Sequence, residues 1–262
     1  MTTFLETVIA HTQDELSRRR AAVPIDALRA QIEGPPPAPR FFDGLAAPGM
    51  SLIAEMKRAS PSKGAIQAGA RVAPIVQAYA DAGASAISVL TEPKWFQGSL
   101  DDLATAHATV DIPLLRKDFI VDEYQLVEAR VIGASAALLI VAAFSTAREL
   151  AAMIEMATRI GLDTLVEVHD EREAAIAQSV GAAIIGINNR DLHSLEVDLS
   201  TSFRVRAQIA PGTIVVAESG ITTRDDVRAL EEAGVDAILV GEALMGVGNP
   251  AATAAELLGR TS

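Results

Sequence analysis

Eight short apolar runs, spaced roughly 20 to 30 residues apart, constrain the fold of this chain more than any other sequence feature. The spacing matches the combined length of one strand, one helix and two loops. The runs are rich in β-branched residues and mostly continuous, which is typical of a parallel sheet buried on both faces. The sequence therefore predicts parallel strands at Ser51–Met56, Ala84–Leu90, Ile112–Arg116, Ala136–Val141, Asp163–Val168, Ala182–Asn188, Thr213–Glu218 and Asp236–Val240.

Helix boundaries are marked between these runs. Several segments place a hydroxyl residue three positions before a carboxylate, which is the capping-box spacing at a helix start. Glycines stand shortly before five of the strands, where a left-handed residue often ends a helix. The capping pairs are Ser99–Asp102, Thr146–Glu149, Thr223–Asp226 and the weaker Asp170–Glu173, and the glycines are Gly83, Gly133, Gly161, Gly181 and Gly234.

Two architectures satisfy such a repeat, a closed eight-stranded barrel and an open doubly wound sheet. An open sheet usually carries a nucleotide-binding motif after its first strand. The segment from Lys57 to Gly64 matches neither G-x-G-x-x-G nor the P-loop. We therefore predict an α/β fold of the (β/α)8 TIM-barrel class and keep the open sheet as the alternative.

The first 50 residues precede the repeat and are predicted to form an N-terminal helical extension. Phe4–Arg20 has helical spacing, Ile25–Leu28 continues it, and Gly34–Pro37 ends it as a rigid connector. We expect this extension to lie over one mouth of the barrel. Residues 1–262 are predicted to form one barrel domain.

The composition and net charge of the chain exclude several classes of binding partner and site. The net charge of −12 argues against a nucleic-acid binder, and the absence of cysteine excludes disulfides, thiolate metal sites and cysteine catalysis. Glu6 and Asp14 interrupt any secretory segment, and the weakly polar run Val131–Phe144 is too short to span a bilayer. We predict a cytoplasmic protein, a monomer or at most a weak oligomer, that binds neither nucleic acid nor membranes.

Ionisable residues end several apolar strands. The first, third, fifth and seventh predicted strands end near Glu55, Lys117, Glu167 and Glu218, and Lys57 shares a strand face with Glu55. Alternate strands of such a barrel fill the same interior layer, so these groups are predicted to converge at its carboxyl-terminal mouth. They are either a polar plug that closes the barrel or a proton-transfer site, and the number of convergent groups favours the site.

Two glycine-containing turns follow the last two strands, at Glu218–Ile221 and Gly241–Leu244. Loops at these positions often bind phosphate through backbone amides. They predict a phosphate site, with Lys57 as the nearest added positive charge.

Loop aromatics predict a flat apolar slot for a ring, although ordinary loop packing is the alternative. The four histidines have no metal-ligand spacing, so we predict solvated or supporting histidines and no metal. The slot residues are Pro61, Trp95, Phe96, Phe119, Leu138 and Leu192, and the histidines are His11, His107, His169 and His193.

Five motifs resemble the indole-3-glycerol phosphate synthase family. The resemblance covers all eight strands in order and the N-terminal extension. It implies a (β/α)8 barrel that closes the phosphorylated substrate 1-(2-carboxyphenylamino)-1-deoxyribulose 5-phosphate to the indole, losing CO2 and water without a cofactor. The motifs are Ile53–Ser62, Leu115–Ile120, Leu165–His169, Gly186–Leu192 and Ala217–Ile221.

The resemblance also implies roles for the charged residues. Lys117 resembles the family's general acid, which protonates the ribulose carbonyl oxygen as the ring carbon attacks. Glu167 resembles the acid/base of the later dehydration. Glu55 is expected to orient a lysine and stabilise positive charge, and Asn188 and Ser219 to orient the substrate.

The same resemblance implies a set of substrate- and phosphate-binding positions. Glu242 stands where some relatives carry a hydroxyl residue. Because a carboxylate beside a phosphate would repel it, only the backbone amide of Glu242 is expected to bind the phosphate, and the carboxylate is expected to point away from the phosphate. Lys57 is expected to contact the phosphate and also to take part in the reaction, and Asn189 receives no role. The positions are Lys57, Ser60, Arg190, Glu218, Gly220, Gly241 and Glu242.

Two other functions are compatible with parts of the sequence. Phosphoribosylanthranilate isomerase is a neighbouring barrel enzyme, but its acid/base pair typically includes a cysteine, which this chain lacks. A catalytically inactive barrel that only binds a phosphometabolite is the second rival. Such a protein has no reason to keep both Lys117 and Glu167.

Overall fold

A computed structural model describes residues 3–32, 34–36, 39–67, 69–192, 194–246 and 249–260, and within them eight parallel strands close into a barrel. Neighbours in the ring are neighbours along the chain, and β1 completes it by pairing with both β4 and β10. This confirms the (β/α)8 prediction and excludes the open sheet. The strands are β1 (Ser51–Met56), β4 (Ala86–Leu90), β5 (Leu114–Lys117), β6 (Ala136–Ile140), β7 (Asp163–Val168), β8 (Ile184–Asn188), β9 (Ile214–Glu218) and β10 (Ala237–Val240).

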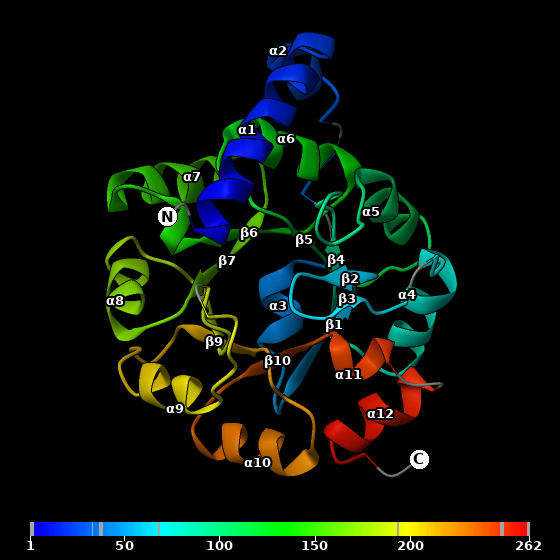
Figure 1. The fold of residues 1–262 in the computed structure, drawn as a ribbon, viewed down its shortest axis with the longest axis vertical. Helices are drawn as coiled ribbons and strands as arrows, with labels where there is room; N and C mark the ends of the chain where they lie inside the picture. The colour runs from blue at the N-terminus through cyan, green and yellow to red at the C-terminus, as the bar shows by residue number, and fades with distance from the viewer. Residues whose placement is uncertain are drawn as a thin grey trace.

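The helices form an outer ring around the strands (Figure 1). None of the described helices is both long and apolar enough to cross a lipid bilayer. The ring consists of α4 (Val72–Asp81), α5 (Leu100–His107), α6 (Glu123–Ile132), α7 (Ala147–Arg159), α8 (Glu171–Ser179), α9 (Ser200–Arg206), α10 (Arg224–Glu232) and α12 (Pro250–Leu257), with the short η1 (Val141–Ala143) and α11 (Glu242–Met245) between.

The predicted strand bounds agree with the structure to within two residues. β1 and β7 have the predicted limits, whereas β4 begins at Ala86 rather than Ala84. The amide of Ala84 bonds to the carbonyl of Tyr79 at the end of α4, so this residue belongs to the helix cap. The two-residue strands β2 (Ala59–Ser60) and β3 (Gly64–Ala65) form a hairpin that was not predicted, because strands this short show no periodicity.

The predicted helix signals act as expected with one difference. All five glycines have positive φ. Every predicted capping side chain accepts the amide three residues on, but only Thr223–Asp226 forms the reciprocal box. Asp102 instead pairs with Arg58, because this partly buried guanidinium competes for its carboxylate.

The N-terminal extension divides between the two ends of the barrel. It consists of α1 (Phe4–Ala22), α2 (Ile25–Arg29) and α3 (Phe41–Leu45), and Figure 1 shows α3 near the barrel axis. At the amino-terminal ends of the strands, the Ser51 hydroxyl donates to the carbonyl of Leu45 and the Phe42 amide donates to Asp163. The prediction of an extension over one mouth is therefore wrong for α3, whose five residues are too few to show a helical pattern.

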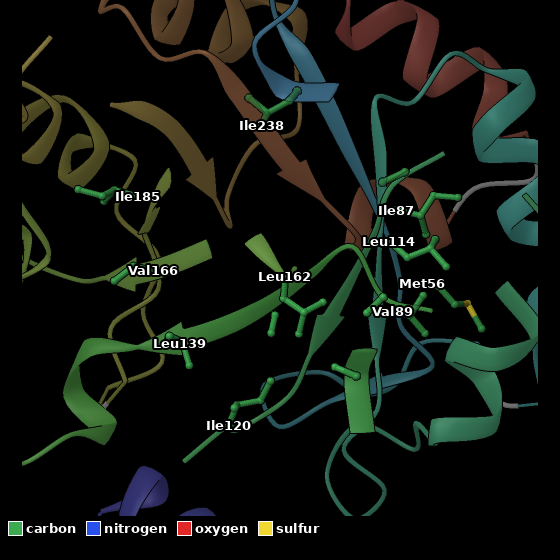
Figure 2. Packing of buried hydrophobic residues seen from close by; sticks show 14 of the residues in the cluster. Met56, Ile87, Val89, Leu114, Ile120, Leu139, Leu162, Val166, Ile185 and Ile238 are labelled. Carbon is green, nitrogen blue, oxygen red and sulfur yellow. The ribbon is translucent and has the colours of Figure 1, made fainter. Parts of the chain in front are cut away.

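Strand side chains alternate between two cores. Leu114 packs in the core between sheet and helices, part of which Figure 2 shows, whereas Leu115 packs inside the barrel with Phe41 and Leu45 of α3. The same alternation sends Arg116 outward and Lys117 inward. The strand period thus decides which charged side chains reach the mouth.

Candidate active site

A cavity of about 510 Å³ opens at the carboxyl-terminal ends of the strands, where barrel enzymes hold their active sites. Of the described residues predicted for the site, only Trp95 does not line it. Phe4 of α1 also lines the cavity, so the extension contributes to this mouth. The polar strand ends therefore converge on one space.

Lys117 lies between two carboxylates. Its amine donates to Glu167 Oε2 at 3.1 Å and is also hydrogen-bonded to Glu218 Oε2. The three side chains come from β5, β7 and β9, alternate strands of the ring. The amine and both acids are buried or nearly so, so their charges interact through little water.

The surroundings of this trio separate the two acids. Burial alone would lower the pKa of Lys117, but Glu218, Glu167 and Glu55 outweigh it and raise that pKa, so the amine keeps its proton. Burial raises the pKa of Glu218 to about 7, aided by the charges of Glu167 and Glu55 against the effect of Lys117. Burial acts in the same direction on Glu167, but Lys117, His169 and Asn188 hold its pKa well below the usual range. One acid is thus ionised and the other titrates near neutrality, a pairing suited to acid/base work.

Glu167 is held by neighbours on both oxygens. Asn188 Nδ2 donates to Oε1 at 3.2 Å, and His169 Nε2 lies 3.3 Å from the same oxygen. The Asn188 carbonyl oxygen accepts from the Ser219 hydroxyl at 2.9 Å and from the Arg190 amide at 3.0 Å. These acceptor contacts orient the amide so that its NH2 group faces Glu167.

Two glycines make room for the buried acids. A Cβ on Gly186 would lie 2.2 Å from Glu218 Oε1, and one on Gly241 would lie 2.6 Å from Glu55 Oε1. Any side chain at either position would displace a carboxylate. Gly186 therefore has a packing role in the site that the sequence motif alone does not reveal.

A second charged cluster lies beside the first. Lys57 Nζ is 2.8 Å from Glu55 Oε1 and 4.0 Å from Glu242, which also contacts Lys63 at 2.9 Å and Arg190 at 3.2 Å. Burial would raise the pKa of Glu242, but Lys63, Lys57 and Arg190 lower it. The Glu242 carboxylate therefore faces three cations of the predicted phosphate site, whereas the sequence led us to expect that it points away from a bound phosphate.

The turn after β9 is conformationally unusual. Ser219 and Gly220 have φ of 66° and 79°, a left-handed region that a serine seldom adopts. Asn189, to which the sequence assigned no role, is buried and donates to the carbonyls of Glu218 and Ser219 at 3.0 Å. These bonds hold Ser219 where its hydroxyl reaches Asn188.

Apolar residues form one wall of the cavity. Phe96 and Phe119 pack with ring centroids 6.2 Å apart, whereas Trp95 packs edge-on against Phe4 at 5.8 Å and supports that wall from behind. Glu92 organises this loop by accepting the amides of Lys94, Trp95 and Phe96. The lining members of the predicted slot are Pro61, Phe96, Phe119, Leu138 and Leu192.

Sequence reasoning missed Phe4, Lys63 and Glu92. Each reaches the site from a loop or from the extension, and none ends a predicted strand. His169 was expected to be solvated or supporting, and it lies mostly buried between two acids. His11 packs edge-on against Trp95, and His193 lies outside the described residues.

No set of three metal-ligating side chains in the described ranges is grouped as a metal ion would require. Besides its carboxylates, the cavity wall presents amines, a guanidinium, an amide and hydroxyls. These donor groups suit an anionic organic molecule.

Comparison of the sequence with protein families matches residues 5–257 to the model of indole-3-glycerol phosphate synthase. Indole-3-glycerol phosphate synthase 2 of Streptomyces coelicolor is 47% identical over 259 residues, covering 99% of this chain and 100% of that protein. The indole-3-glycerol phosphate synthases of Streptomyces griseus and Mycolicibacterium smegmatis are 48% and 44% identical, over 97% and 98% of this chain and 94% of each relative.

Solved structures share the fold at much lower identity. Thiamine phosphate pyrophosphorylase from Pyrococcus furiosus has a TM-score of 0.60 at 20% identity, covering 79% of this chain and 93% of that one. N-acetylmannosamine-6-phosphate 2-epimerase from Clostridium perfringens has a TM-score of 0.61 at 12% identity, covering 80% and 93%. These likenesses support the barrel alone.

Proposed function

The chain belongs to the indole-3-glycerol phosphate synthase family. We propose that its Lys117 cluster, formed by Lys117, Glu167 and Glu218, carries out the chemistry of that enzyme. The enzyme is a carboxy-lyase of tryptophan biosynthesis. It closes 1-(2-carboxyphenylamino)-1-deoxyribulose 5-phosphate to indole-3-glycerol phosphate with loss of CO2 and water. The proposal concerns which residues of this chain perform each step.

Lys117 is the general acid of ring closure. When the ring carbon that bears the carboxylate attacks the ribulose carbonyl, negative charge develops on the carbonyl oxygen. A buried ammonium that donates its proton to this oxygen stabilises that charge. The bond to CO2 then breaks, and its electrons restore the aromatic ring. The observation that carries this role is the position of the amine between Glu167 and Glu218 on the cavity wall.

Glu167 is the acid/base of the dehydration that follows. It is ionised and lies against the same amine, so it is placed to accept the proton that the ring-closed intermediate loses from the carbon next to the hydroxyl-bearing carbon. Glu167 then delivers a proton to the hydroxyl, which leaves as water as the carbon–carbon double bond forms. Glu55 orients Lys57 and stabilises positive charge on the ring system. Asn188 and Ser219 orient the substrate through their linked hydrogen bonds.

The phosphate lies where the second cluster gathers its cations. Lys57 and Arg190 supply positive charge, and Ser60 and the amides of Gly220, Gly241 and Glu242 supply hydrogen bonds. Glu218 contacts the substrate between this site and Lys117. The substituted ring occupies the apolar slot beside Phe96 and Phe119.

An assay of the purified protein tests the proposal directly. The anthranilate-ribulose substrate is added without metal or cofactor, and formation of the indole is followed by fluorescence. Turnover by the wild-type protein and its loss in Glu167→Gln support the assigned roles. Binding of substrate without turnover indicates an inactive barrel, and full activity of Glu167→Gln removes that residue from the chemistry.

Replacement of Lys57 tests the phosphate site. Lys57→Met removes a charge–phosphate contact, so KM should rise about tenfold or more while kcat falls less than in Lys117→Ala. Steady-state kinetics of both variants check this. An unchanged KM with a large loss of kcat would move Lys57 into the chemistry.

We further propose that the chain acts as one domain in the cytoplasm, as a monomer or at most a weak oligomer, on a small phosphorylated substrate and with no nucleic-acid or membrane partner. The net charge of −12 supports this. Light scattering during size-exclusion chromatography measures the mass, and a stable assembly of several chains would contradict it.

A further inference from the structure

His169 lies next to the proposed acid/base, at the point where β7 ends and α8 begins. Its side chain is 11% exposed and lies between two carboxylates. Nε2 is 3.3 Å from Glu167 Oε1, and Nδ1 is 3.0 Å from Glu173 Oε2. The ring therefore joins the active-site acid to an acid on the first turn of α8.

Both ring nitrogens face acceptors. Glu173 also accepts the backbone amide of His169 at 2.8 Å, so its carboxylate is fixed toward the ring. Nε2 is buried and has no hydrogen-bond partner within the described ranges, which leaves Glu167 as its nearest polar neighbour. A bare nitrogen lone pair at 3.3 Å from a carboxylate would be repelled, so each nitrogen carries a proton.

We propose that His169 is a positioning residue of the reaction: its imidazolium, held between Glu167 and Glu173, fixes the orientation and the negative charge of the Glu167 carboxylate. This inference rests on the proposed role of Glu167. It names an imidazolium–carboxylate pair behind the acid/base, where the sequence predicted only a solvated or supporting histidine.

The pair explains why the two acids beside Lys117 differ. Both contact the same amine, but only Glu167 has a second cation and an amide donor on its other oxygen. Glu218 Oε1 is buried without a hydrogen-bond partner among the described residues. The negative charge of the two acids beside Lys117 is therefore concentrated on Glu167.

The charges around His169 agree with this arrangement. Burial alone would lower the pKa of the imidazole, but Glu167 and Glu173 raise it to about 10. Glu167 from β7 and Glu173 from α8 are the charged groups that face the ring, while Lys117 and Glu218 face Glu167. The imidazole thus keeps its proton through neutral pH, since its charge is lost only as the pH rises toward 10.

Nitrogen NMR of the histidine side chains tests the charge without reference to activity. The protein is labelled with 15N-histidine, and the resonances of His169 are assigned by their loss in His169→Gln. Both ring nitrogens should show imidazolium shifts at pH 7 and titrate near pH 10. A neutral tautomer at pH 7 would overturn the inference.

Kinetics test the consequence for catalysis. His169→Gln removes the positive charge, so kcat should fall roughly tenfold or more with a smaller change in KM, in line with other partners that orient an active-site group. The acid limb of the pH–kcat profile should move to higher pH, because Glu167 then holds its proton more tightly. An unshifted profile would overturn the inference.

Glu173→Gln keeps the fold and weakens the same pair. The amide still accepts the backbone N–H, so we expect a smaller fall in kcat and a smaller shift in the same direction. Glu149→Gln is the matched control, because Glu149 holds the same position at the start of α7. Within the part of the chain that the structure describes, its carboxylate accepts only a backbone amide, that of Ser145. Equal effects of the two variants would reduce Glu173 to a helix cap and overturn its part in the pair.

The proposed function fails in a different way. If Glu167→Gln retains full activity, the role of Glu167 is wrong whatever His169 does. If Glu167→Gln is inactive while His169→Gln is unaltered in kcat and pH profile, the role of Glu167 stands and only this inference falls.

Discussion

Strand β5 carries two neighbouring cations that point to opposite sides of the barrel wall. Lys117 points inward and contacts Glu167 and Glu218 at the cavity. Arg116 points outward, is fully buried, and contacts Asp118 at 2.9 Å and Glu128 at 3.1 Å. Each cation thus lies between two carboxylates, and the carboxylates of both clusters are buried.

The two clusters differ in what they leave open. The Arg116 guanidinium also donates to the carbonyl of Gln125 and to the Thr91 hydroxyl, and Glu128 is further bound by Arg19 of α1. The Lys117 cluster borders a cavity and leaves Glu218 Oε1 without a hydrogen-bond partner among the described residues. Burial of charge therefore does not mark a catalytic site. A catalytic site is marked by a buried charge that borders a cavity and has a neighbouring group with an unused hydrogen-bonding atom.

The largest expected effect is the loss of turnover in Lys117→Ala. Without its general acid the enzyme should lose on the order of 10²- to 10⁴-fold in kcat, while substrate binding stays measurable. The fold should persist, because Glu218 titrates near neutrality and can take a proton in the absence of the amine. Kinetics and thermal unfolding check both parts, and near-wild-type turnover would place the acid elsewhere.

Arg116→Met should show the opposite pattern. Two carboxylates would lose their buried partner, so the free energy of unfolding should fall by about 3–5 kcal/mol. The folded fraction should retain most of its kcat, because Arg116 does not reach the cavity. Denaturant unfolding and active-site titration measure the two quantities. A kcat loss as large as that of Lys117→Ala would end the distinction between the clusters.

The pH dependence sharpens the comparison. The pKa of Glu218 is raised from 4.5 to about 7, so the folded chain binds the proton of this carboxyl more tightly than the unfolded chain does. The resulting stability is fully present below pH 4.5 and is lost as the pH rises through 7. The difference in unfolding free energy between wild type and Glu218→Gln should therefore fall over this range. A difference that does not change with pH would show that Glu218 does not titrate there.

Arg19→Ala should have the smallest effect. Arg19 is partly exposed, and its partner Glu128 remains bound to Arg116. We expect a loss of about 1 kcal/mol or less in unfolding free energy and no change in kcat. Denaturant unfolding measures it. A loss comparable to that of Arg116→Met would mean that α1 is essential to the outer cluster.

The sequence by itself determined most of the barrel. Strand placement, glycine caps and helix starts follow from short-range rules, namely side-chain period, the steric freedom of glycine and hydrogen bonds to nearby amides. The inward direction of Glu55, Lys117, Glu167 and Glu218 follows from the same period. These features could be predicted because each depends on a few consecutive residues.

Tertiary structure alone decided which distant side chains meet. It placed α3 at the amino-terminal end of the barrel, Trp95 behind the cavity wall, the Glu242 carboxylate among three cations, and His169 between two acids. Such contacts depend on the electrostatics and packing of residues far apart in sequence. A charged side chain pairs with whichever opposite charge the folded backbone places nearby, and no local sequence pattern identifies that partner.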